Sequence, residues 1–126
     1  MQEYDLYKVI EKISVRTGMY IGDQTLSNVD SYLNGYEDAM NDAGIRNATY
    51  PSLVHFRDWL KVKFDFVSDV PGSGNMILAL AVGYEPKKDL PWAKMKNASE
   101  AQHIRSLELF FGLVEEYKKD RGGATN

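Results

Sequence analysis

The clearest structural signal in the chain is the segment SNVDSYLNGYEDAMNDAG, which runs from Ser27 to Gly44. Apolar and aromatic residues recur in it at intervals of three and four, the spacing that places side chains on one face of an α-helix. These residues are Val29, Tyr32, Leu33, Tyr36, Ala39, Met40 and Ala43. We expect a capping box of Ser27 with Asp30 at the start and a left-handed Gly44 at the end. Because Gly35 costs about 1 kcal/mol relative to alanine in a helix, we expect a close backbone approach there.

Helical patterning also flanks this segment. Apolar residues at helical spacing predict a helix over residues 6–13, with Asp5 as its N-cap. The same spacing predicts a helix that ends near Phe64, with Pro51 in its first turn, and a final helix from about Asn97 to Tyr117. The last of these carries two adjacent apolar rows, so we expect it to bury a wide stripe.

Two segments are harder to assign from their pattern. The apolar run from Met76 to Val82 has no periodicity, but its Met, Leu and Ala content favours a buried helix over a buried strand. Residues Lys61–Phe66 alternate strictly between polar and apolar side chains, which is a strand signal. We favour a helix that ends near Phe64, and the choice between helix and strand for Lys61–Phe66 stays open.

The predicted architecture is a mainly α, compact, single-domain bundle of about five helices. It covers residues 1–120, with an exposed connector over Glu85–Lys96 and a flexible C-terminal tail over residues 121–126. The length of 126 residues agrees with one domain, and a chain of this size can bury a core without disulfides.

Composition excludes several classes of function. The absence of cysteine removes disulfide scaffolds, thiol nucleophiles and cysteine-based metal sites. A net charge of −3 argues against general binding of nucleic acid, which requires a basic surface. No apolar run approaches the length of a membrane span and the N-terminus lacks a secretory pattern, so we expect a cytoplasmic protein that does not engage membranes.

The most distinctive motif is RTGMYIG at Arg16–Gly22. It resembles the R-P-G-M-Y-I-G segment near the start of the ATPase subunits of DNA gyrase and its relatives, with Thr17 in place of the proline. That family also has a helix with a catalytic Glu and a magnesium-binding Asn, then an Asp-x-Gly-x-Gly stretch that holds adenine, and this chain contains neither. We therefore expect a structural role, in which the glycines allow a tight turn and Met19–Ile21 fill the core.

A broader pattern resembles a group of small bacterial proteins. The matching pieces here are RTGMYIG at 16–22, NGY at 34–36, HFRDW at 55–59 and NMIL at 75–78. Some members of this group look like immunity partners encoded beside toxins. The resemblance therefore implies a binding protein that inhibits a cognate toxin and needs no cofactor, rather than an enzyme.

The charge pattern offers separate support for a binding role. Between Arg16 and Arg46 there is no basic residue, and five acidic residues fall in this interval. The polar face of the helix predicted from Ser27 to Gly44 gives the candidate partner-binding residues Asp30, Asn34, Glu37, Asp38, Asn41 and Asp42. Such a surface suits a basic protein partner, such as the substrate cleft of a nuclease toxin, because complementary charge accelerates encounter and fixes orientation. A solvated helix face explains the same residues, although ordinary exposed helices usually mix charge signs.

Two alternative functions stay open. The first is a small hydrolase or nuclease in which His55, Asp58 and His103 supply acid–base catalysis. His55 also borders an apolar face, so a partly buried histidine paired with a helix neighbour is the simpler interpretation. The second is a homodimeric structural or regulatory subunit with the Met76–Val82 run near its interface.

Ligand motifs are weak elsewhere in the chain. The two histidines are far apart and the acidic residues lack the spacing of a metal-binding loop, so we expect no metal site. The stretch Gly72–Asn75 precedes a predicted helix and could hold an anion at its N-terminus. A plain turn with Ser73 as N-cap explains the same stretch.

Overall fold

A computed structural model describes residues 2–17, 22–67 and 72–122 of the chain. Along the chain its elements are β1 (Glu3–Tyr4), α1 (Leu6–Val15), α3 (Leu26–Asp42), β2 (Arg46–Asn47), the short 3-10 helix η1 (Leu53–His55), α4 (Phe56–Phe64), α5 (Ser73–Val82), α6 (Trp92–Lys96) and α7 (Glu100–Arg121). The described part holds five helices of nine or more residues and one parallel pair of two-residue strands. The predicted mainly α fold is confirmed.

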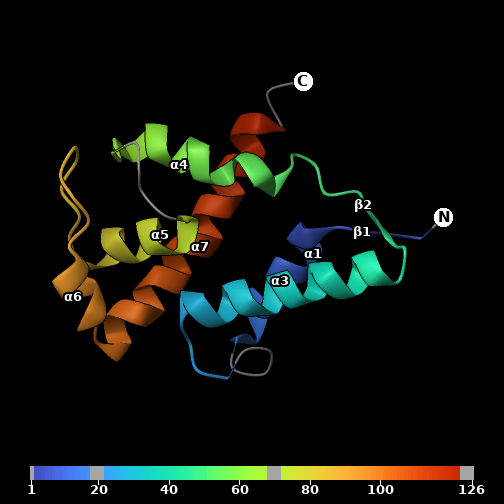
Figure 1. The fold of residues 1–126 in the computed structure, drawn as a ribbon, viewed down its shortest axis with the longest axis horizontal. Coiled ribbons are helices and arrows are strands. Elements are labelled where there is room, and N and C mark those ends of the chain that lie inside the picture. The colour runs from blue at the N-terminus through green and yellow to red at the C-terminus, as the bar shows by residue number, and fades with distance from the viewer. Residues whose placement is uncertain (1, 18–21, 68–71, 123–126) are drawn as a thin grey trace.

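The longest helix, α7, runs diagonally through the molecule with α5 packed along it (Figure 1). In the same view α4 lies on one side of α5 and α3 on the other. The strands β1 and β2 pair in parallel with Glu3 opposite Arg46, beside the C-terminal end of α3. The helices α3, α5 and α7 contact one another, and residues from all three line the candidate site.

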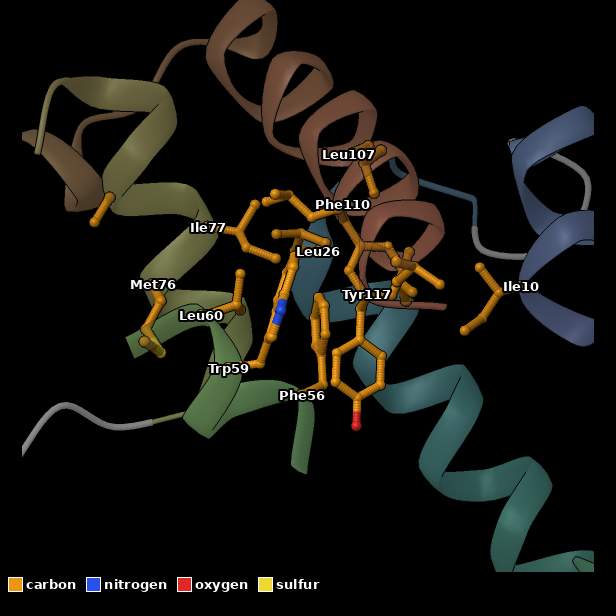
Figure 2. Close-up of a cluster of buried hydrophobic side chains, with 14 of the residues drawn as sticks. Ile10, Leu26, Phe56, Trp59, Leu60, Met76, Ile77, Leu107, Phe110 and Tyr117 are labelled. Atoms are coloured by element: carbon orange, nitrogen blue, oxygen red, sulfur yellow. The ribbon is translucent and has the colours of Figure 1, made fainter. Parts of the chain in front are cut away.

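A cluster of aromatic and aliphatic side chains joins these helices (Figure 2). Phe56 and Trp59 of α4 both meet the ring of Tyr117 of α7 at centroid distances of 5.4 Å. The other helices add buried residues to the same cluster, including Ile10 from α1, Leu26 from α3, Met76 and Ile77 from α5, and Phe110 from α7. Burial of this apolar surface supplies the main stabilisation of the fold.

Two tyrosine hydroxyls hold the segment that leads into η1. The Tyr117 hydroxyl donates a 2.7 Å hydrogen bond to the Ser52 carbonyl, and the Tyr7 hydroxyl donates to the Pro51 carbonyl. Burial raises the pKa of both tyrosines, so both phenols stay protonated donors at neutral pH. The start of η1 is thereby fixed to α1 and α7, and Leu53 of η1 lines the same cavity as residues of α3 and α5.

The helix α3 begins earlier than the sequence predicts. Thr25 is its N-cap and accepts a hydrogen bond from the Asn28 amide at 3.2 Å, so the predicted capping box of Ser27 with Asp30 is wrong. The end of the helix is confirmed, because Gly44 has a φ of +71° directly after it. The predicted close approach at Gly35 is wrong, since among the described residues no atom beyond its chain neighbours and the adjacent backbone of α3 lies within 4 Å of a Cβ placed there.

The alternating segment Lys61–Phe66 ends a helix and is not a strand. The helix α4 stops at Phe64, Asp65 takes a left-handed conformation with a φ of 55°, and the chain leaves the helix at Phe66. Phe66 is buried and stacks on Tyr84 at 4.3 Å between ring centroids. The alternation therefore does not mark one buried face: Val62 is exposed on α4, Phe64 is half-buried, and Phe66 is buried beyond the end of the helix.

The run Met76–Val82 forms most of α5, which confirms the prediction of a helix. Its residues Met76, Ile77, Ala79 and Val82 are buried in the core of the chain itself. The other three residues of the run, Leu78, Leu80 and Ala81, are half-buried, and the homodimer hypothesis stays a prediction.

Two boundaries differ near the C-terminus. The segment predicted as an exposed connector contains α6 and buries Leu90 and Met95. The last helix begins at Glu100, because Ser99 and Gln102 form a reciprocal capping box. Arg121, assigned by the sequence to the tail, is instead the last residue of α7.

The prediction that Met19–Ile21 fill the core falls outside the described residues.

Candidate functional site

A cavity of about 580 Å³ lies where α3, α5, α7 and η1 meet. Its volume falls within the range of pockets that bind small molecules or single side chains. Leucine, valine and phenylalanine side chains form its apolar wall, namely Leu6, Leu26, Leu33, Leu53, Val54, Phe56, Leu78 and Phe110. The cavity thus combines side chains from segments that are far apart in the sequence.

Polar groups line the cavity from three helices. They are Thr25, Ser27, Asp30, Ser31, Asn34 and Glu37 from α3 and its cap, Ser73 and Asn75 from α5, and His103 and Ser106 from α7. Neither lysine nor arginine is present among the described residues that line it. The ionisable groups of the lining are therefore Asp30, Glu37 and His103, and the two carboxylates give the cavity an acidic character.

Asp30 is packed against the start of α5. A Cβ placed on Gly74 would lie 2.5 Å from Oδ2 of Asp30, so the absence of a side chain at Gly74 makes room for the carboxylate. The N-cap of α5, Gly72, offers no side-chain cap, and the positive end of the helix faces this carboxylate. Burial nevertheless raises the pKa of Asp30 above its ordinary value.

Glu37 lies two helical turns further along the same side of α3 and is half-buried. It stands near Tyr4 of β1. Burial raises the pKa of the Tyr4 phenol, and the charge of Glu37 raises it further. Tyr4 also makes an edge-to-face contact with Tyr36 at a centroid distance of 5.7 Å. Glu37 therefore marks the end of the cavity that is nearest to the strands.

The six residues predicted as a partner-binding surface divide into two sets. The pocket set consists of Asp30, Asn34 and Glu37, which line the cavity. The outer set consists of Asp38, Asn41 and Asp42, which are exposed and do not line it. None of the three ion pairs in the described part of the chain involves an acidic residue of α3.

The structure separates the three residues of the predicted catalytic alternative. His103 lines the cavity, whereas His55 and Asp58 do not. His55 is exposed at the junction of η1 and α4, so the interpretation of a partly buried histidine is wrong. Residues 53–55 form a 3-10 turn, which rotates His55 away from the apolar face that continuous α-helical spacing predicts.

Sequence reasoning missed most of the cavity wall. Ser106 is fully buried, and its hydroxyl donates a 2.6 Å hydrogen bond to the His103 carbonyl at the cavity. Nothing in the sequence around Ser106 signals a pocket. The predicted anion site at Gly72–Asn75 does line the cavity, but the side chain that faces Gly74 is a carboxylate. Ser73 is the first residue of α5 rather than its N-cap.

In residues 2–17, 22–67 and 72–122, no helix has both the length and the apolar character that a membrane crossing requires. The same residues contain no group of three or more histidine, aspartate or glutamate side chains placed to hold a metal ion.

Comparisons of the chain with protein-family models, with curated proteins and with solved structures find no match.

Proposed function

We propose that this protein is a binding domain of the immunity type, which neutralises a basic toxin through the acidic side of α3. The observation that carries this proposal is the charge of α3: it has four carboxylates, Asp30, Glu37, Asp38 and Asp42, and no lysine or arginine. Figure 1 shows α3 along one edge of the molecule. The resemblance to small bacterial proteins noted for the motifs around residues 16, 34, 55 and 75 supports the inhibitor role.

The carboxylates of α3 are not expected to stabilise the fold. Like charges spaced three or four residues apart on a helix repel each other; Asp38 and Asp42 have this spacing, and α3 contains no lysine or arginine to offset their charge. Surfaces of this kind are common where a protein must meet a partner of opposite charge, because the field steers the encounter and orients the complex. Inhibition then requires only that α3 covers the partner's active cleft.

The test compares the wild type with the triple variant Glu37→Gln/Asp38→Asn/Asp42→Asn. A partner captured at low salt from the native cell lysate is purified, and its association rate is measured by stopped flow at low and high salt. We expect the triple variant to associate at least about tenfold more slowly at low salt and to show a flatter salt dependence. The purified partner's activity, with and without the protein, shows whether binding inhibits it.

A matched control removes three charges elsewhere. Glu85, Asp89 and Glu108 are exposed and lie outside α3, so the variant Glu85→Gln/Asp89→Asn/Glu108→Gln changes the net charge equally. It should keep most of the wild-type association rate. Equal slowing in both variants would assign the effect to net charge and would contradict a role for α3. An unchanged rate in the α3 variant would contradict the proposal directly.

A further inference from the structure

The cavity between α3, α5 and α7 has the features of a site for a cation on an apolar stem. Asp30 and Glu37 line it without a lysine or arginine among the described lining residues. No ion pair in the described part of the chain neutralises either carboxylate. Phe56 and Phe110 belong to the apolar wall of the same cavity.

We propose that this cavity receives the guanidinium group of an arginine side chain, which inserts from the basic partner and pairs with the Asp30 carboxylate, while Glu37, two helical turns away, adds negative charge to the same cavity. This inference rests on the proposed function and names the anchor by which the partner is held. The outer set of α3 then steers the approach of the partner, while the pocket set supplies the desolvated contact that slows its release.

An arginine fits this site better than an anion does. The uncapped start of α5 attracts negative charge, but the Asp30 carboxylate already lies against Gly74 at that position. An added anion would be repelled by the negative charge of both carboxylates, whereas a cation is attracted by it. Among cations, guanidinium is weakly hydrated, pairs with carboxylates in a planar bidentate geometry and stacks on aromatic rings. The apolar wall suits the methylene stem of the same side chain.

The test uses two blocked tripeptides of equal shape, acetyl-Gly-Arg-Gly-amide and acetyl-Gly-citrulline-Gly-amide. Each is titrated into the ¹⁵N-labelled protein, and amide chemical shifts are followed by NMR. We expect the arginine peptide to shift amides of the cavity lining, such as Asn34, Gly74 and Asn75. The citrulline peptide has the same length but no charge, so it should bind at least about tenfold more weakly.

Three variants locate the site. Asp30→Asn/Glu37→Gln should abolish the shifts caused by the arginine peptide. Glu85→Gln/Asp89→Asn makes the same change in net charge outside the cavity and should leave the shifts intact. Gly74→Ala keeps both carboxylates but places a methyl 2.5 Å from the present position of Asp30 Oδ2, so it should displace that carboxylate and weaken binding several-fold. The amide spectrum of each variant shows that it is folded.

A last titration distinguishes an arginine side chain from a free polyamine as the ligand of the cavity. Spermidine is titrated under the same conditions, and binding of spermidine without binding of the arginine peptide would overturn the proposal. Equal binding of the arginine and citrulline peptides, or shifts confined to the outer set of α3, would overturn it too. The two proposals fail separately. If partner association does not depend on the charges of α3, the proposed function is contradicted. If association depends on those charges but the arginine peptide does not bind, only the arginine pocket is contradicted.

Discussion

At the scale of single residues, the partly buried carboxylate of Asp30 lowers the stability of the folded state at neutral pH. Its carboxylate is half-buried beside Gly74, and burial raises its pKa. A raised pKa means that the native state binds the proton more tightly than the unfolded state does. Stability therefore falls as the pH rises from 3.8, the ordinary pKa of this carboxyl, toward the raised pKa of Asp30 in the folded protein. Residues that lower stability in this way are typical of binding sites.

We predict that Asp30→Asn increases the free energy of unfolding at pH 7, because it removes a charge that burial disfavours. The increase should be full above the native pKa of Asp30, and it should vanish as the pH falls below 3.8, where the carboxyl is protonated in both states. Urea unfolding at a series of pH values measures this difference. Glu108→Gln, which removes one charge from an exposed position outside the cavity, serves as control. A variant less stable than wild type at pH 7 would mean that the start of α5 stabilises the carboxylate by more than burial disfavours it.

At the scale of elements, the start of α3 decides how the site helix is held. The Thr25 side chain satisfies the Asn28 amide, whereas Ser27 lies inside the first turn and is exposed. A cap residue satisfies a backbone N–H that has no partner within the helix, while a serine inside the turn does not.

We therefore predict that Thr25→Ala lowers the free energy of unfolding by about 1 kcal/mol. The matched variant Ser27→Ala should change it by less than about 0.5 kcal/mol, since surface substitutions away from caps have small effects. Both are measured as shifts of the urea midpoint with an unchanged slope. A larger loss of stability for Ser27→Ala than for Thr25→Ala would contradict Thr25 as the N-cap and favour the capping box of Ser27 with Asp30.

At the scale of the whole molecule, one cluster of buried side chains connects all the longer helices of the described part of the chain. Trp59 is inside this cluster and donates its indole N–H to Asp120 of α7 at 2.7 Å, whereas Trp92 of α6 is 52% exposed. A core shared in this way favours cooperative unfolding.

We predict a single unfolding transition, which would support the single-domain prediction for residues 1–120. The chain has two tryptophans, so Trp92→Phe leaves Trp59 as the sole reporter of the core. Its fluorescence and the far-UV circular dichroism should give coincident urea curves. Separate midpoints for the two signals would show that part of the chain unfolds independently of the core.

Local patterns were sufficient for the five longer helices and insufficient for the short helix α6 and for the helix ends. Periodicity predicted α1 and α3, and residue type predicted α5, because a helix is formed by hydrogen bonds between near neighbours. The errors fall where a boundary depends on which side chain reaches which amide. Thr25 rather than Ser27 caps α3, and the 3-10 turn that exposes His55 begins after a segment held by two distant tyrosines.

The helical architecture and the acidic character of α3 can be predicted from the sequence, since both depend on residue types at fixed spacing along one segment. Which of those acids share a cavity depends on how the helices pack. Asp30 and Gly74 meet because α3 packs beside α5, and His103 joins the same cavity while His55 does not. Such contacts depend on the packing of helices that are distant in the chain, and no local pattern encodes that geometry.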